Sequence, residues 1–230
     1  MIDEKLLQSI PHIGEIAHRG AFSGVPEKNV ETFQNRSREK NKILPSLEDA
    51  IRAAGLQDGM TISFHHHFRG GDHVVNKVVG TLAQMGFRNL TLAASSLAAV
   101  HAPLIEHIKS GVITHIETSG LRGELAEQIS RGLMDCPVVF RSHGGRAAAI
   151  RSGELHIDVA FLGAPSCDPY GNANGYSRDR DTGVICGSMG YAKVDAQYAK
   201  KTVILTNNLV PYPNAPFGIP ESDVDYIVLM

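Results

Sequence analysis

The stretch MTISFHHHFRGGDHVVNKVVGTLAQMGFRNLTLAA, residues 60–94, holds two strand-like runs with a helical pattern between them. MTISF (60–64) and NLTLAA (89–94) are short and mostly apolar, as buried strands are. The segment 72–86 repeats apolar residues every three or four positions, which predicts a helix with Asp72 as its possible N-cap. A strand, a helix and a second strand of this length predict a βαβ unit with parallel strands.

The same alternation continues on both sides of this unit. Upstream, Ser46 and Asp49 predict a capped helix that ends near Gly55. Downstream, helices are expected at 103–111, 123–133 and 146–153, and strands at 112–118, 137–142, 156–164, 201–206 and 223–229. Several strands are apolar without strict alternation, which indicates that helices cover both faces of the sheet. We therefore expect an α/β fold with a mainly parallel sheet of about six to seven strands.

The chain divides into two regions by composition. Residues 1–45 are polar and are interrupted by glycine and proline, so they predict an N-terminal extension or cap. The alternating strands and helices occupy residues 46–230, which we expect to form one α/β domain.

Charge and cysteine content exclude several classes of protein. The formal net charge is −2 and the basic residues do not cluster, which gives no basis for binding nucleic acid or an anionic membrane. No apolar run approaches the ~20 residues that a membrane-spanning helix needs, and the first residues do not resemble a signal peptide. The three cysteines contain no CxxC pair, so neither a disulfide framework nor a zinc site is indicated. We expect a cytoplasmic protein.

Ligands of open α/β sheets bind beyond the carboxyl ends of the strands, so the loops at that edge are the candidate site. These loops are predicted at 65–72, 95–102, 119–123, 142–145 and 165–176. Most of them place glycine beside a polar side chain, a composition typical of loops that offer backbone N–H groups to an anion or an acyl oxygen.

Three consecutive histidines, His65, His66 and His67, lie in the first of these loops. In an extended segment adjacent side chains point to opposite faces, so only His65 and His67 could share a metal ion. Further ligands from His101 or His143 are conceivable, but no HExxH-type spacing supports them. We therefore predict a structural or substrate-loop role, with no bound metal.

Other polar residues have two interpretations each. His143 could be a general base, although such a residue more often only hydrogen-bonds a neighbouring loop. Cys167 is interpreted as a packed thiol and Asp158 as a hydrogen-bonding residue at a strand start. Three arginines of the loops are either carboxylate anchors or ordinary solvated charges: Arg69, Arg122 and Arg146.

From residue 46 to the last residue, the sequence resembles the citrate lyase alpha subunit family. The resemblance is carried by SLEDAIRAAGLQDG, SHGGR, SGELHIDVAFLGAPSCDPYGNANGY and CGSMGYAKVDAQYAKKTVILTNNLVPYP, in matching order and spacing. More distantly, the strand–loop–helix at 60–80 and the D-x-x-G-N motif of Asp168, Gly171 and Asn172 resemble family I CoA-transferases. The resemblance implies a CoA-transferase-like (NagB/RpiA-like) domain.

The resemblance also implies an activity and its partners. Alpha subunits exchange the acetyl group of a carrier-protein thioester for citrate, which yields a citryl-thioester and acetate, and acetyl-CoA can replace the carrier. The beta subunit then cleaves the citryl-thioester, and the gamma subunit is the acyl carrier. No cofactor is bound permanently, because the thioester arrives on CoA or on the phosphopantetheine-type arm of the carrier.

The resemblance places substrate and thioester binding in the loops at the strand ends. The residues expected there are His65, His66, His67, Arg69, Gly70, Gly71, Asp72, Asn76, Ser95, Ser96, Gly120, His143, Gly144, Gly145, Asp168, Gly171 and Asn172. In family I CoA-transferases the nucleophilic glutamate comes from a second half, and no glutamate here has the matching motif. We therefore expect the chain to be inactive alone and to associate with itself or with partners; the alternative is a binding or assembly module without turnover.

Overall fold

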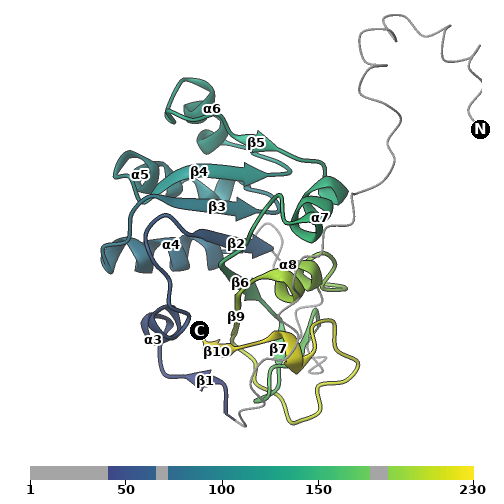
Figure 1. Ribbon diagram of the computed structural model, residues 1–230. Coiled ribbons are helices and arrows are strands. Elements are labelled where there is room, and N and C mark those ends of the chain that lie inside the picture. The colour runs from purple at the N-terminus through teal and green to yellow at the C-terminus, as the bar shows by residue number, and fades with distance from the viewer. Residues whose placement is uncertain (1–40, 66–71, 177–185) are drawn as a thin grey trace, which may run out of the picture.

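The computed structural model describes residues 41–65, 72–176 and 186–230, and within them the main sheet has eight strands. Their order is β1-β10-β9-β6-β2-β3-β4-β5, and each neighbouring pair is parallel (Figure 1). The strands are β1 (Ile43–Leu44), β2 (Thr61–His65), β3 (Leu90–Ala94), β4 (Ile113–Thr118), β5 (Val139–Phe140), β6 (Val159–Gly163), β9 (Lys201–Thr206) and β10 (Tyr226–Leu229). The predicted α/β class is confirmed, with slightly more strands than expected.

Helices cover both faces of this sheet, as the apolar strands predicted. On β6, Val159 and Phe161 pack into one hydrophobic core, whereas Ala160 and Leu162 pack into the core on the opposite face. The first core also takes side chains from α3 (Leu47–Ala53), α4 (Val74–Gln84), α5 (Leu104–Lys109) and α6 (Glu124–Ser130). The second core takes side chains from α7 (His143–Ser152) and α8 (Ala192–Tyr198).

The predicted N-cap Ser46 is present, whereas the N-cap of α4 is His73, one residue after the predicted Asp72. The Ser46 hydroxyl accepts a hydrogen bond of 3.0 Å from the Asp49 N–H at the start of α3, and Gly55 follows the helix with a φ of 68°. At α4 the Asp72 carboxylate accepts from the Val74 N–H at 2.8 Å, so it satisfies a donor of the first turn. These local hydrogen bonds explain why both helices begin close to the predicted residues.

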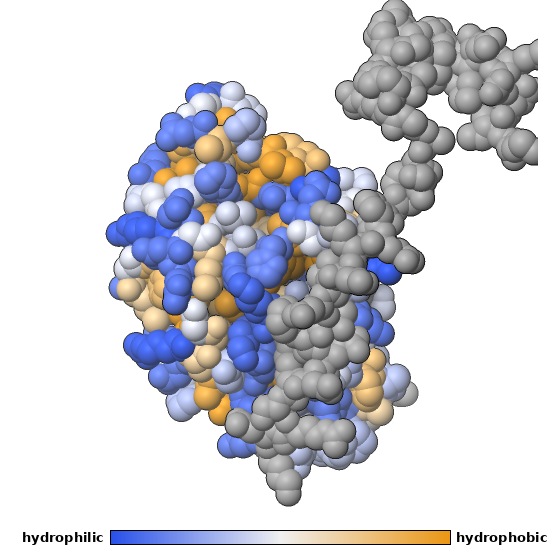
Figure 2. Space-filling view, in the orientation of Figure 1, coloured by the Kyte–Doolittle hydropathy of each residue, from blue (hydrophilic) through white to orange (hydrophobic). Residues whose placement is uncertain are grey.

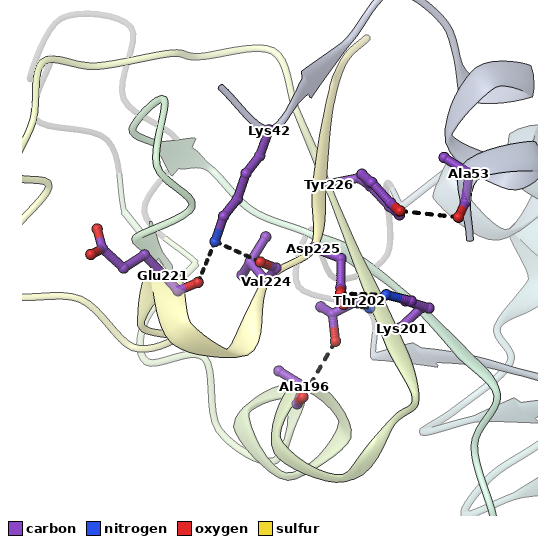
Figure 3. A network of polar contacts seen from close by, with 9 residues as sticks. All are labelled: Lys42, Ala53, Ala196, Lys201, Thr202, Glu221, Val224, Asp225 and Tyr226. Carbon is purple, nitrogen blue, oxygen red and sulfur yellow. Dashed lines mark hydrogen bonds and ion pairs between the residues drawn. The ribbon is translucent and has the colours of Figure 1, made fainter. Parts of the chain in front are cut away.

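The sheet begins slightly before the predicted domain boundary. Residues Ile43 and Leu44 form β1 and pair with Ile227 and Val228 of β10, although the sequence placed them in the extension. Lys42, just before β1, is buried and donates to the main-chain carbonyls of the segment that leads into β10 (Figure 3). The folded unit therefore includes residues from at least Lys42 onward; the earlier part of the extension lies outside the described residues.

Several elements differ from the sequence-based expectation. Helix α7 begins at His143, so the predicted loop 142–145 is its N-cap and first turn, and Ser142 Oγ accepts from the Gly145 N–H at 3.0 Å. The expected strand 137–142 is reduced to β5, an edge strand of two exposed residues. Helix α8 was not predicted, because its buried Asp195 interrupts the apolar stripe. The small antiparallel pair β7 (Ser166–Cys167) and β8 (Ala173–Asn174) was also not predicted.

Candidate functional site

The carboxyl ends of the parallel strands form one edge, and three sequence-distant side chains meet there. His65 is the last residue of β2, His143 is the first residue of α7, and Tyr191 is the N-cap of α8. The His65 and His143 rings lie 5.8 Å apart in an edge arrangement, and the His143 and Tyr191 rings lie 4.8 Å apart. In Figure 1 the tip of β2 points toward α7 and α8. This contact gives the predicted His65 and His143 a common location.

The loops after β3 and β4 run side by side and bring Ser95, Ser96 and Gly120 together. The Leu97 N–H donates to the Gly120 carbonyl at 2.8 Å, and the Ser119 N–H donates to the Ser95 carbonyl at 3.3 Å. A Cβ atom added to Gly120 would lie 3.3 Å from Ser96 Oγ, so the two loops approach closely. Ser119, which the sequence did not single out, has a buried hydroxyl without a hydrogen-bond partner among the described residues.

Two predicted residues lie at the N-terminal end of α4: Asp72 just before the helix and Asn76 in its first turn. Asn76 Nδ2 donates to the Val100 carbonyl at 2.8 Å and thereby ties the helix to the loop after β3. Its Oδ1 is buried and accepts no hydrogen bond from the residues that the structure describes. Asp72 is buried two residues before the helix, where its carboxylate accepts from the Val74 N–H. Both side chains therefore hold the scaffold of the site, and a ligand role for them stays a prediction.

Arg146 is not a solvated arginine of the rim. It lies in α7, is 3% exposed, and its guanidinium forms two hydrogen bonds of 2.7 and 2.8 Å with the Asp195 carboxylate of α8. It also donates to Ser63 Oγ of β2 at 3.2 Å and to the Ala93 carbonyl of β3 at 3.1 Å. The interpretation of Arg146 as a carboxylate anchor for substrate is therefore wrong: its carboxylate partner is internal. Arg122 is exposed on the loop after β4.

The D-x-x-G-N motif forms a buried turn between β7 and β8. Asp168 Oδ1 accepts from the N–H groups of Tyr170, Gly171 and Asn172 at 3.0–3.1 Å. Its Oδ2 accepts from Asn172 Nδ2 at 2.9 Å and from the Asn214 N–H at 3.0 Å. The carboxylate of Asp168 thus stabilises this turn, and the substrate-binding role that the resemblance implied for the motif stays a prediction.

Cys167 and Asp158 have the structural roles that the sequence predicted for them. Cys167 is fully buried, donates its thiol to the Asp168 carbonyl at 3.3 Å, and has its pKa raised by burial and by the negative charge of Asp168. Asp158, just before β6, accepts from the Thr61 N–H at 2.9 Å and from Lys200 Nζ at 2.8 Å. Cys167 is therefore a packed thiol, and Asp158 is a hydrogen-bonding residue at a strand start.

Metal binding has no support in the described ranges, where no three His, Cys, Asp or Glu side chains converge on one point. His101 Nδ1 accepts from the Ala98 N–H at 2.9 Å, which gives this histidine a local structural role. In the same ranges no helix is long and apolar enough to cross a membrane. Five predicted site residues lie outside the described residues: His66, His67, Arg69, Gly70 and Gly71.

Tyr191 is the main site residue that sequence reasoning missed. It follows Gly187, Ser188, Met189 and Gly190, a stretch in which glycine again lies beside a polar side chain ahead of a helix. That composition singled out the other loops, and it would have singled out this one had α8 been predicted. Tyr191 was therefore missed because helix α8 was not predicted.

Comparison with known proteins shows strong similarity to one family. The family model for the citrate lyase alpha subunit matches residues 40–230. The citrate lyase alpha chain of Escherichia coli is 57% identical over 208 residues, which cover 90% of this chain and 39% of that protein. This chain thus spans less than half the length of that relative.

Solved structures agree with this similarity. The alpha subunit of citrate lyase from Streptococcus mutans, in complex with citrate, superposes with a TM-score of 0.82 and 49% identity and covers 96% of this chain and 44% of that one. Glutaconate CoA-transferase from Acidaminococcus fermentans shares only 15% identity at a TM-score of 0.58, covering 82% of this chain and 75% of that one, so the likeness concerns the fold alone. The chain belongs to the citrate lyase alpha subunit family.

Proposed function

We propose that this chain forms the citrate- and thioester-binding part of a citrate CoA/acyl-carrier-protein transferase. In that reaction the acetyl-thioester and citrate exchange partners: the thioester bond to acetyl breaks, a thioester bond to citrate forms, and acetate leaves. The observation that carries the proposal is the 49% identity, across 96% of the chain, to an alpha subunit whose structure holds citrate.

The geometry of the strand-end edge suits this chemistry. Attack on a thioester carbonyl places negative charge on its oxygen, and backbone N–H donors held in place stabilise that charge. The loops with Ser95, Ser96 and Gly120 lie together at this edge, near the first turn of α7. The N–H groups of Ser95, Gly120 and Gly145 already donate to Phe64, Thr118 and Ser142, so the proposed donors are the N–H groups of Ser96 and Gly144. Citrate is a tricarboxylate, and the His65, His143 and Tyr191 side chains are hydrogen-bonding groups suited to carboxylate oxygens.

The nucleophile of the exchange is proposed to lie outside this chain, as the resemblance to family I CoA-transferases implies. The thioester then reaches the site on CoA or on the carrier arm, and no permanently bound cofactor is required. The proposed partners are the beta and gamma subunits of a cytoplasmic citrate lyase complex. Without a supplied nucleophile, the chain alone is expected to bind substrates but not to turn them over.

The test is citrate-dependent release of acetate from acetyl-CoA. The chain is assayed alone and then with the remaining part of a related alpha subunit expressed separately. Activity in the mixture but not in either part supports the proposal. Activity of the chain alone would place a nucleophile within it and contradict the divided site. If the two parts associate without releasing acetate, the transferase assignment is wrong.

A second function, a binding or assembly module without turnover, is favoured by exposed apolar side chains. Val139 and Phe140 of edge strand β5 are 41% and 59% exposed, and Figure 2 shows hydrophobic surface near this strand. Edge strands with apolar side chains are prone to pair with other chains. This surface also supports the expectation of association. Substitution of Phe140 by lysine should abolish association, measured by sedimentation, if β5 is the contact.

A further inference from the structure

Three elements of the fold each contribute two residues to a stack of two side-chain layers at the candidate site. The strand β2 and the helices α7 and α8 form this unit, and Figure 1 shows them meeting at one end of the sheet. The inner layer consists of Ser63, Arg146 and Asp195. The outer layer consists of His65, His143 and Tyr191.

The spacing within each element explains why two layers form. Ser63 and His65 are two positions apart on β2, so their side chains point to the same face of the sheet. His143 and Arg146 are three positions apart on α7, and Tyr191 and Asp195 are four apart at the start of α8. Residues three or four apart are neighbours on a helix surface. Each residue of the outer layer is therefore the neighbour, on the same face of its own strand or helix, of a residue of the inner layer.

The inner layer is a buried, charged contact between the two helices and the sheet. Arg146 and Asp195 are 3% and 0% exposed, and the guanidinium contacts the carboxylate through two nitrogens. Ser63 Oγ accepts from Arg146 and donates to the Asp195 carboxylate. The planar fork of the guanidinium fixes both distance and orientation, so α7 and α8 are held in one relative position.

Stability alone is a weak reason for such a contact. Burying two charges costs much of what their attraction returns, and well-packed apolar residues often replace a buried ion pair without loss of stability. Here the pair is also incompletely hydrogen-bonded, because Arg146 Nε is buried and meets no acceptor within the described part of the chain. A directional contact that contributes little net stability is better explained by the geometry that it imposes.

We propose that Arg146 and Asp195, with Ser63, are positioning residues that set the ring contact between His143 and Tyr191 and hold both beside His65. Tyr191, 39% exposed, and His143, exposed on α7, then present their polar atoms to one ligand oxygen of a carboxylate or thioester. The ligand part of this inference rests on the proposed function. The positioning part concerns the structure of this chain alone.

The test replaces the ion pair by apolar side chains and observes the rings. In the 230-residue chain, the variant R146M/D195L should remain folded but lose the fixed position of α7 against α8. The readout is the NMR ring-current shift that the Tyr191 ring imposes on the ring protons of His143. The His143 signals are assigned by their absence from the spectrum of His143→Gln. Tyr191→Leu defines the shift expected without the ring, and Tyr191→Phe should retain the native shift because the aromatic ring remains.

The proposal expects the His143 signals of R146M/D195L to move most of the way to their position in Tyr191→Leu. The matched control, E106L/K109M, removes an exposed ion pair of α5 and should leave these signals unchanged. If the folded double variant keeps the native His143 shift, the positioning role is wrong. If the double variant does not fold, Ser63→Ala decides, because loss of the shared hydroxyl should move the same signals in the same direction, and unchanged signals overturn the proposal.

A kinetic measurement distinguishes failure of this inference from failure of the proposed function. In the acetate-release assay with the complementing part, R146M/D195L should lose about 10²-fold in kcat/KM for citrate, since displacement of a positioned group by about 1 Å has effects of this size. Thermal unfolding should stay near that of the unchanged chain. If the unchanged chain shows no exchange, the proposed function fails, yet the NMR measurement still decides the positioning role.

Discussion

Lys42 and Glu221 are 179 positions apart in the sequence, yet Lys42 Nζ donates a hydrogen bond of 2.6 Å to the main-chain carbonyl of Glu221 (Figure 3). The same ammonium donates to the Val224 carbonyl at 2.7 Å. The first described strand is thereby fastened to the segment that leads into β10. This contact makes the start of the domain part of its C-terminal edge.

Substitution of Lys42 by methionine should therefore destabilise the domain. The side chain keeps its length, but two carbonyls lose a donor in a buried place, which should lower the free energy of unfolding by about 1–3 kcal/mol. Urea denaturation measures this change. Lys109→Met, which removes an exposed ion pair with Glu106, is the control and should change stability by about 0–1 kcal/mol. Equal effects of the two substitutions would contradict the role of Lys42.

Asp158 should make stability depend on acid pH. Burial tends to raise its pKa, but the hydrogen bonds from Lys200 and from the Thr61 N–H outweigh this effect, so the pKa lies below the ordinary 3.8. A carboxylate with a depressed folded-state pKa stabilises the fold above its unfolded pKa and loses this contribution as pH falls through the folded value. The stability difference between the unchanged chain and Asp158→Asn should thus be present at neutral pH and shrink below pH 3.8. Denaturation curves across that range measure it, and a difference independent of pH would refute the assignment.

Gly171 should tolerate alanine poorly because two separate costs add there. Its φ is 111°, and a Cβ atom would lie 2.9 Å from Val224 Cβ. Gly86 has a φ of 91° with open space around it, so Gly86→Ala isolates the backbone cost, about 1–2 kcal/mol. Gly171→Ala should lose about 1–3 kcal/mol more through overpacking. Urea unfolding of both variants tests this, and similar losses would mean that Val224 moves away freely.

Cys167 should resist alkylation while the protein is folded. Its pKa is raised by burial and by Asp168, so the reactive thiolate is scarce, and the side chain is fully buried. Cys136 is partly exposed and serves as the internal control. Mass spectrometry after iodoacetamide treatment should find Cys136 modified and Cys167 modified only after denaturation. Early modification of Cys167 would show that the β7–β8 region opens.

The histidines should not carry a stoichiometric metal. Elemental analysis of the purified chain should find less than one zinc per molecule, and His66→Ala should leave that value unchanged. The prediction rests on the alternating directions of adjacent side chains in an extended segment. One zinc per chain, lost on substitution of His66, would reinstate a metal site in the 65–72 loop.

Much of the fold was predictable because its signals are local. The helix α4 follows from the spacing of Val75, Val78, Val79 and Leu82, which are all buried as expected. The helix α8 was not predictable in this way, because Asp195 occupies an inward position that only a distant arginine makes favourable. The same reason reversed the interpretation of Arg146, whose partner lies 49 residues further along the chain.

The sequence by itself determined the α/β class, the order of most strands and helices, the N-cap at Ser46, and the family. The family follows from the motifs that resemble it, and the other three properties depend on periodicity and on hydrogen bonds between residues close in the chain. Tertiary structure alone decided which polar residues meet: the ring contact of His143 with Tyr191, the ion pair beneath it, and the internal role of Asp168. Burial makes a charged side chain depend on its partner, and the partner is selected by how helices pack on the sheet, which no local pattern encodes.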